Sequence, residues 1–485
     1  MKYNICMLLF LLSISYIGIN SSYSNSMQIP NLGDTSSRFM SISQENKIGD
    51  IIHAQILGSF NLNSDPIVNN YIRLLGNKLL NNNFSDPIKY RFLVANDSTI
   101  NAFATPGGII VINSGIFLKT KSEAELAGIL AHEIAHIKAR HLSRMYEESS
   151  QVNITSALTI LASIIASMYD SSNLGKTFIA GKNISATNQI KFIRENEKEA
   201  DRMAIEILIK ANINPNGMSS FFETLSNEEN DSNSLEFLRT HPVTKNRIIE
   251  AQNLASQYEG TNFINDSYEY QLVSERIKIE KLDTKQFVNN YKQDSTNKIN
   301  KNYIIDNYKY CLALIEQGKN EKAIEVIKNI IEEINLTKDS YNIKKYLYLT
   351  LSEAYFNNNN EKSIEILENL NKIYSTDGTT LIYLANAYLK NNDYKKVLDI
   401  LIPYVVENKD HNLIKKISEA AYKLKNNSLG HEYQGDYHKI LGKFNSAIKF
   451  YRLAVKYNMK GKTIAERINS KIKEIERLQE TKEIL

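Results

Sequence analysis

The sequence predicts an α+β domain followed by an all-α domain of helical repeats. Residues 25–255 mix short β-branched runs with segments of helical spacing, and from about residue 299 the pattern becomes almost entirely helical. In that second part an Ala-Tyr pair recurs at positions 354, 387 and 421. A chain of 485 residues is too long for one hydrophobic core and suits two or three domains.

The composition is that of a globular protein, with 42% hydrophobic and 23% charged residues. The formal net charge of +4 is small for this length. It gives no reason to propose nucleic acid or an anionic membrane surface as a partner.

The first 24 residues are predicted to be a signal peptide. Lys2 precedes an apolar run, Ile5–Ile19, and Ser22-Tyr23-Ser24 has small residues at the spacing a signal peptidase accepts. A buried first helix and a retained anchor are the alternatives, although the run is short for a bilayer span of about 20 residues. Cleavage would leave Cys311 as the one cysteine, which excludes an internal disulfide. Export without disulfides suits a bacterial periplasm.

Residues 25–255 carry the elements of the predicted α+β domain. Pro66–Leu80 has helical spacing. The apolar face of this helix would comprise Ile67, Tyr71, Leu74, Leu75 and Leu79. Ile88–Val94 alternates as a strand does, Gly108–Asn113 is a second β-branched run, and Pro106 with the glycines after it marks a turn.

A helix is predicted to start at Ser122, with Glu125 completing a capping box, and to run toward Arg140. The apolar stretch Ile154–Met168 is predicted as a buried helix, or else as a surface that touches a membrane or covers the active site. The small and polar residues 171–188 indicate a loop.

The second half resembles a tetratricopeptide repeat domain, because a period of about 34 residues with paired helices is typical of that repeat. Ala354-Tyr355, Ala387-Tyr388 and Ala421-Tyr422 mark first helices. Matching second-helix segments are Glu321–Ile327, Glu361–Leu367, Tyr394–Ile400 and Asn445–Ile448. Four repeats are predicted in residues 299–485, and residues 256–298 are expected to connect the domains through a helix near Tyr268–Ile279.

His132-Glu133-Ile134-Ala135-His136 forms an H-E-x-x-H motif inside the helix that starts at Ser122. Side chains four residues apart lie one turn apart on the same face, so both imidazoles can reach one tetrahedral zinc ion. Glu133 lies beside them and can take a proton from the attacking water. A solvated helix face is the alternative, but the apolar residues around the motif favour a buried helix.

Two histidines leave a zinc ion short of a protein ligand. The segment Glu195–Asp201 is predicted to open a helix that continues through Leu208, and it contains Glu197 and Asp201 one helical turn apart. Glu197 can be the third ligand, and Asp201 can accept a hydrogen bond from a ligand imidazole. On spacing alone, a solvated acidic start of a helix fits this segment equally well.

Together these motifs resemble the zinc peptidases of the CAAX prenyl protease and HtpX type, which supply the third ligand from an E-x-x-x-D motif. The resemblance covers the whole first half of the chain. The matching segments are 29–33, 43–45, 49–50, 65–66, 101–104, 106–108, 132–136, 194–201 and 240–242, with Tyr71 and Arg247. It implies a gluzincin domain holding one Zn²⁺ through His132, His136 and Glu197.

The same resemblance implies roles for further residues. His241 would lie near the metal, as a resting-state ligand or as the group that polarises the substrate carbonyl, and Arg247 would orient that loop or a nearby carboxylate. Asn101, Ala102, Phe103 and Ala104 would form an edge strand to which an extended substrate adds. The prenyl proteases cross the membrane several times. This sequence has no such spans, so prenylated substrates are not expected.

The chain is most similar to periplasmic family members that combine a peptidase domain with tetratricopeptide repeats. This resemblance implies a zinc endopeptidase that acts on misassembled outer-membrane β-barrel proteins, contacts the envelope assembly machinery through its repeats and lies in the periplasm, peripheral at the outer membrane. A largely latent peptidase acting as a chaperone-like binding factor is the alternative. Processing of lipoproteins at the membrane is a third hypothesis.

Overall fold

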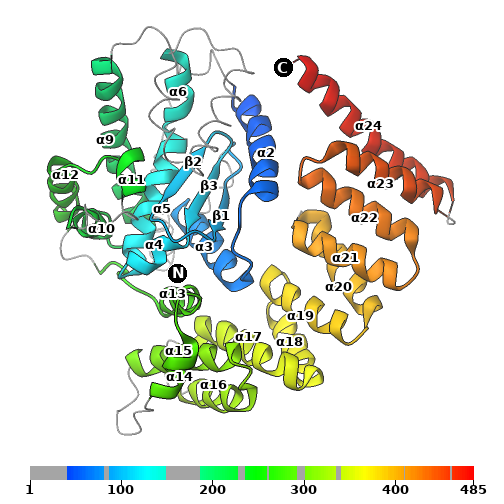
Figure 1. Ribbon diagram of the computed structural model, residues 1–485. Coiled ribbons are helices and arrows are strands. Elements are labelled where there is room, and N and C mark those ends of the chain that lie inside the picture. Colours follow the sequence, from blue (N-terminus) through cyan, green and yellow to red (C-terminus); the bar gives the residue numbers. More distant parts are fainter. Residues whose placement is uncertain are drawn as a thin grey trace, which may run out of the picture.

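The computed structural model describes residues 41–80, 87–148, 186–227, 235–258, 262–291, 301–334, 340–408, 410–458 and 461–484. The expected signal peptide, the apolar stretch 154–168 and almost all of the loop 171–188 lie outside these residues. Figure 1 shows a small sheet enclosed by helices and, beside it, an arc of helices that continues to the C-terminal end.

The sheet has three strands in the order β1-β3-β2 among the described residues. β1 (Arg91–Ala95) runs parallel to β3 (Ile109–Asn113), and β2 (Ala102–Thr105) runs antiparallel to it. All five residues of β3 are buried, as expected for a central strand. The strand predicted from Ile88 begins three residues later, and β2 lies at the edge of the sheet, where the resemblance to the zinc peptidases implied an edge strand.

Helix α3 (Pro66–Leu79) confirms the first predicted helix. The Asp65 carboxylate accepts a hydrogen bond from the Ile67 N–H, and Pro66 occupies the first turn, where a missing N–H costs nothing. The predicted apolar face is buried except at Leu74, which is 45% exposed. Leu74 lies at the edge of that face and lines a cavity of about 440 Å³ instead of the core.

Helix α5 (Glu123–Lys138) carries the H-E-x-x-H motif, and almost every one of its residues is buried. Its first turn is capped by the Ser122 side chain, which accepts from the Glu125 N–H. The predicted capping box is incomplete, because the Glu125 carboxylate accepts from the Lys121 N–H at 2.7 Å and not from Ser122. Among the other helices in this half, α10 (Asn216–Asn227) and α6 (His141–Glu148) contact α5. Further ones are α2 (Ile42–Ser59), the short helix α4 (Gly115–Lys119), α11 (Leu235–Thr240) and α12 (Lys245–Ser256).

Helix α9 (Ala186–Lys210) carries the acidic segment and packs along α5. The prediction that Glu195 opens this helix was wrong, because the helix begins nine residues earlier. Gln189, Lys191 and Arg194 are good helix formers, and none of the residues 189–194 is of a type that caps the start of a helix. Glu197 and Asp201 therefore lie in the middle of a long helix.

The second half is all-helical in the described residues. It follows the connecting helices α13 (Tyr268–Ile279) and α14 (Thr284–Asn290). Its helices are α15 (Lys301–Glu316), α16 (Asn320–Ile334), α17 (Ser340–Asn358), α18 (Asn360–Ile373), α19 (Gly378–Lys390), α20 (Tyr394–Glu407), α21 (His411–Lys423), α22 (Asn427–Ile440), α23 (Phe444–Lys456) and α24 (Lys462–Ile484). Each helix packs against the next one along the arc. Ala354, Ala387 and Ala421 are fully buried, and their small side chains allow close helix packing.

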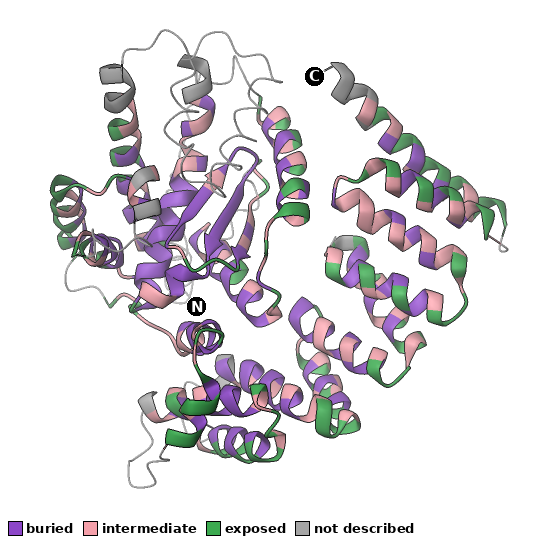
Figure 2. Ribbon diagram, viewed as in Figure 1, coloured by how far each residue is buried: buried purple, intermediate pink, exposed green. Residues whose placement is uncertain are grey.

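The two halves touch near the start of the arc, at α19 and in the turn after α22. Near the start, the Arg276 guanidinium of α13 binds the Asp65 carboxylate at the start of α3 and the Glu353 carboxylate of α17. Further along, Gly442, in the turn after α22, approaches Ala54 of α2 so closely that an added Cβ would lie 3.1 Å from the Ala54 Cβ. Figure 2 shows buried residues at the contact near the start of the arc, where α13 and α17 meet.

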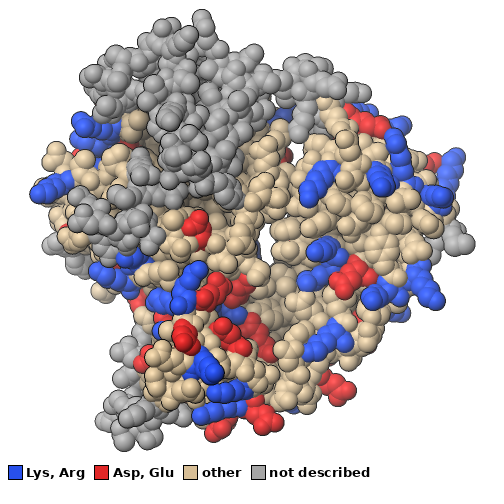
Figure 3. Space-filling model, viewed as in Figure 1, with Lys and Arg blue, Asp and Glu red and all other residues tan. Residues whose placement is uncertain are grey.

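The surface is mixed in charge. In Figure 3, lysine and arginine side chains are spread over both halves of the visible face, with acidic side chains among them. Within the described residues, no helix combines the length and the apolar character needed to cross a membrane.

Candidate metal centre

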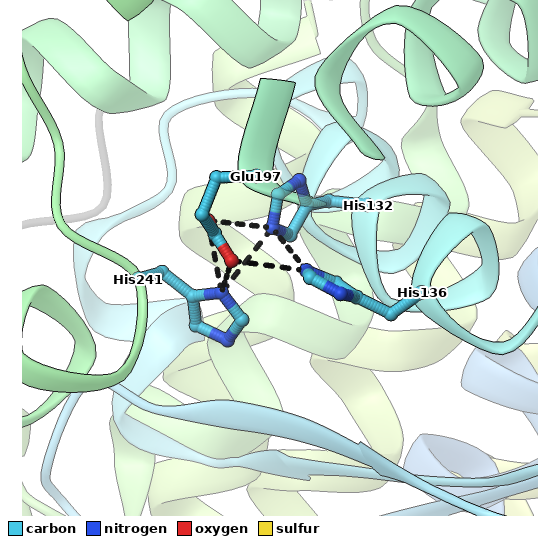
Figure 4. Close-up of side chains that lie close together, drawn as sticks. All are labelled: His132, His136, Glu197 and His241. Atoms are coloured by element: carbon cyan, nitrogen blue, oxygen red, sulfur yellow. Dashed lines mark hydrogen bonds and ion pairs between the residues drawn. The ribbon is translucent and has the colours of Figure 1, made fainter. Parts of the chain in front are cut away.

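Four side chains that the sequence pointed to converge at one point. His132 and His136 come from α5, Glu197 from α9 and His241 from the residue after α11. Figure 4 shows the three imidazoles and the carboxylate facing one another. One possible ligand atom from each lies within 4.8 Å of the others.

The spacing of these atoms fits a single tetrahedral ion. Zinc binds imidazole nitrogen and carboxylate oxygen at about 2.0–2.2 Å, so neighbouring ligand atoms of a tetrahedral site lie about 3.3 Å apart. The Nε2 atoms of His132 and His136 are 3.0 Å apart. Glu197 Oε1 lies 3.3 Å from His136 Nε2 and 3.2 Å from His241 Nδ1. His132 Nε2 lies 3.3 Å from His241 Nδ1. The donor set and its spacing therefore fit a divalent metal.

The surroundings shift the pKa values of the two motif histidines in opposite directions. Burial lowers the pKa of His136 to about 3, so its imidazole is neutral with a lone pair available. Burial also opposes a charge on His132, but hydrogen bonds to Asp201 and Glu197 outweigh it and raise the pKa of His132 to about 10. Burial would raise the pKa of Glu197, yet His241 and hydrogen bonds from the imidazoles hold it well below its usual range.

Asp201 and Arg247 contact His132 and Glu197 on the side away from the point where the ligand atoms converge. Asp201 Oδ1 lies 3.0 Å from His132 Nδ1, on the side of the ring away from His136. Arg247 of α12 donates from Nε and Nη2 to the two Asp201 oxygens and approaches Glu197 Oε2 at 2.9 Å through Nη1. The guanidinium also lies 4.8 Å above the Phe222 ring of α10.

Glu133, the residue after His132 on α5, lies next to the ligand atoms through its contact with His241. The residue is 1% exposed, and its Oε1 is buried without a hydrogen bond in the part of the chain the structure describes. That oxygen lies 3.4 Å from His241 Nε2. Burial raises the pKa of Glu133, which makes the carboxylate a stronger base than one in water.

The edge strand lies next to Glu133. β2 packs on α5, and the backbone N–H of Ala104 donates to the Glu133 carboxylate. Asn101, Ala102 and Phe103 are buried. In the part of the chain that the structure describes, no strand pairs with the outer edge of β2. An extended polypeptide that paired there would run past Glu133 and the converging imidazoles.

Two further residues, His141 and Glu199, contact this site and were not predicted from the sequence. His141, the first residue of α6, lies with its Nδ1 2.8 Å from His136 Nδ1 and its Nε2 3.2 Å from Glu199 Oε2. Glu199 lies between Glu197 and Asp201 in the acidic segment. A third histidine five residues after the motif and a third carboxylate in E-x-E-x-D were the signals available in the sequence.

The α+β fold and this convergence of three imidazoles and a carboxylate beside Glu133 indicate a metallopeptidase. Residues 66–255 match the model of peptidase family M48, so the chain carries an M48 peptidase domain. It is a metalloendopeptidase, as the H-E-x-x-H motif predicted.

The similarity extends beyond the peptidase domain. The chain is 28% identical over 467 residues to the beta-barrel assembly-enhancing protease of Escherichia coli (strain K12), covering 93% of this chain and 92% of that protein. The protein of the same name from Yersinia pestis is 36% identical over 231 residues, 47% of each chain. The mitochondrial metalloendopeptidase OMA1 of Schizosaccharomyces pombe is 29% identical over 182 residues, 37% of this chain and 51% of that protein.

Proposed function

We propose that this chain is a zinc-dependent endopeptidase of the bacterial periplasm that acts in the assembly and quality control of outer-membrane β-barrel proteins. The observation that carries the proposal is the convergence of His132, His136 and Glu197 with ligand spacing, in a chain similar over nearly its whole length to a beta-barrel assembly-enhancing protease. Residues 1–24 would be the signal peptide, and residues 25–255, 256–298 and 299–485 the gluzincin domain, the connection and the tetratricopeptide superhelix.

His132, His136 and Glu197 would hold the zinc ion, because imidazole and carboxylate are the ligands of catalytic zinc sites. When bound, the ion supplies Lewis-acid chemistry, polarising a peptide carbonyl and increasing the acidity of water. Asp201 Oδ1 lies 3.0 Å from His132 Nδ1, where it would accept the proton of that nitrogen and keep the lone pair of the other ring nitrogen directed at the ion. Arg247 holds Asp201 in place.

Glu133 would act as the general base and then the general acid. Its buried oxygen takes a proton from the attacking water and returns it to the amine that leaves when the peptide bond breaks. His241 Nε2, 3.4 Å from Glu133 Oε1, is suited to donate to the substrate carbonyl oxygen. Residues Asn101–Ala104 would align the substrate by strand addition.

The repeat arc would select partners and clients. Concave helical repeats bind extended segments and other proteins, and here the arc contacts the peptidase half through α19, which packs against α3, and through the turn after α22, which approaches α2. Misassembled outer-membrane proteins would be the substrates, and components of the envelope assembly machinery the partners of the repeats.

Activity can be tested with the mature chain and an unfolded casein substrate. We expect digestion that a chelator stops and that added zinc restores, and none with Glu133→Gln. The role in assembly can be tested in E. coli lacking its own beta-barrel assembly-enhancing protease. Wild-type chain, but not Glu133→Gln, should remove a β-barrel protein that fails to assemble, and persistence of that client would contradict the assigned role.

A second function, a largely latent peptidase that works as a chaperone-like binding factor, is favoured by one observation. His241 Nδ1 lies among the ligand atoms, where it would compete with water for a metal position. Suppressed aggregation of an unfolded β-barrel protein by Glu133→Gln, at the wild-type level, would support this function. If Glu133→Gln loses both proteolysis and the suppression of aggregation, that result would argue against a chaperone-like function.

A further inference from the structure

His141 contacts His136 on the side of the ring that faces away from the converging ligand atoms. The His136 Nε2 atom faces Glu197 Oε1 at 3.3 Å, whereas its Nδ1 atom lies 2.8 Å from His141 Nδ1. His141 is 4% exposed, so water does not replace this contact. The two ring nitrogens of His136 therefore have separate partners.

Glu199 is the next member of the same chain of contacts. Its Oε2 lies 3.2 Å from His141 Nε2 and accepts from Arg144 Nη2 at 2.7 Å. The ion pair with the Arg144 guanidinium keeps Glu199 a carboxylate, so Glu199 can only accept a hydrogen bond from His141.

These contacts fix where the protons are. A ligand nitrogen must offer its lone pair, so His136 must carry its proton on Nδ1 if Nε2 faces the ion. The Nδ1 atom of His141 must then accept that hydrogen, which leaves the proton of His141 on Nε2, where it is donated to Glu199. Only one arrangement of protons satisfies all three residues with both imidazoles neutral.

We propose that His141 and Glu199 are positioning residues that lock the tautomer and ring orientation of His136 for metal binding through the chain Glu199–His141–His136. The inference rests on the proposed role of His136 as a ligand. The two motif histidines would then be oriented by different partners at Nδ1. His132 contacts the Asp201 carboxylate directly, whereas His136 contacts a second imidazole, which in turn contacts a carboxylate.

The test is zinc affinity, measured on the mature chain by competition with a chromophoric chelator. His141→Leu removes the acceptor for His136 Nδ1–H and should weaken zinc binding about 10–100-fold, the usual effect of losing such a partner. His141→Asn places an amide oxygen near the position of Nδ1 and should stay within about threefold of wild type. The matched control is Glu206→Gln, because Glu206 is an exposed carboxylate on α9, the helix that carries Glu199. This substitution should not change the zinc affinity.

Glu199 provides a variant that should fold regardless, because its side chain is 45% exposed. Glu199→Leu should weaken zinc binding severalfold in the wild-type background and have no further effect in His141→Asn, since Glu199 acts only through His141. Equal effects in both backgrounds would overturn the proposed chain of contacts.

Histidine-selective ¹⁵N spectra of the zinc-loaded wild-type chain test the proton positions without any substitution. His136 should be protonated at Nδ1 and His141 at Nε2. A His141 protonated at Nδ1, or a His141→Leu variant that binds zinc as tightly as wild type, would overturn the inference. A wild-type chain that binds no zinc would instead overturn the proposed function.

Discussion

Arg247 and Asp201 form a buried, bidentate ion pair next to the candidate metal centre. The guanidinium Nε and Nη2 atoms each lie 2.7 Å from one Asp201 oxygen, and the residues are 4% and 6% exposed. Because Asp201 Oδ1 also contacts His132 Nδ1, this pair links α12 to the motif helix.

Replacing Arg247 by Met should therefore destabilise the metal-free protein. The substitution leaves Asp201 buried without its partner, which costs about 3–5 kcal/mol. The matched control is Arg202→Met, because Arg202 is 61% exposed and its pair with Glu250 lies on the surface, so its loss should cost about 0–1 kcal/mol. Urea unfolding measures both free energies, and equal losses would show that the buried pair contributes no more than a surface one.

Replacing Glu133 by Gln should lower the rate of peptide hydrolysis by about 10²–10⁴-fold, because the amide cannot accept the proton from water. Metal content should be unchanged, since Glu133 is not among the residues with ligand spacing. The measurement pairs a peptide cleavage assay with elemental analysis of the same sample. Proteolysis at the wild-type rate would exclude Glu133 as the base.

The contact between α2 and the repeat arc predicts a pH dependence of stability. Burial, with Arg91 and His411 nearby, lowers the pKa of His53 to about 4 from its usual 6.5, against a small opposing effect of Asp50. Between these values the unfolded chain binds more protons than the folded one. Stability is therefore complete above pH 6.5 and is lost as the pH falls toward 4, by up to about 3 kcal/mol.

The substitution His53→Leu should remove that part of the acid sensitivity. Urea unfolding at pH 7.5 and at pH 5 measures how much free energy of unfolding each protein loses between the two pH values. Comparing the loss in wild type with the loss in the variant cancels the contribution of other titrating groups. If both proteins lose the same free energy between the two pH values, His53 does not titrate as proposed.

Arg276 joins the two halves of the molecule, and its replacement by Met should loosen them. The guanidinium contacts Asp65 of the peptidase half and Glu353 of the repeat half, so two partly buried carboxylates would be left without a cationic partner, at a cost of about 3–5 kcal/mol. Limited proteolysis should then cut within the connecting residues 256–298 sooner than in wild type. The exposed Arg452, paired with Glu476, gives a control in Arg452→Met, and equal cleavage of the two variants would contradict this role.

The residues of α5 could be predicted from the sequence because their geometry is local. The spacing of His132 and His136 fixes their common face within one helix, whatever surrounds it. Glu197 was suggested by spacing and the resemblance together. His241 needed the resemblance, because packing after α11, not spacing, brings its ring to the other three.

His141 and the start of α9 could not be predicted for physical reasons. His141 folds back onto His136 because Arg140 adopts a positive φ of 54°, an uncommon conformation for a non-glycine residue. Arg140 also donates to the buried Glu45 carboxylate of α2, a contact across 95 positions that no local pattern reveals. The early start of α9 escaped prediction because helix propensity continues it without a capping signal.

The measurement that tests the account most directly is the metal content of the purified mature chain and of its Glu197→Gln variant. Elemental analysis without prior exposure to chelator should find about one zinc ion per wild-type chain and a small fraction of that in the variant, since the third ligand is weakened. A wild-type chain without a stoichiometric transition metal, or a variant that retains it in full, would contradict the assignment of His132, His136 and Glu197 as the metal site.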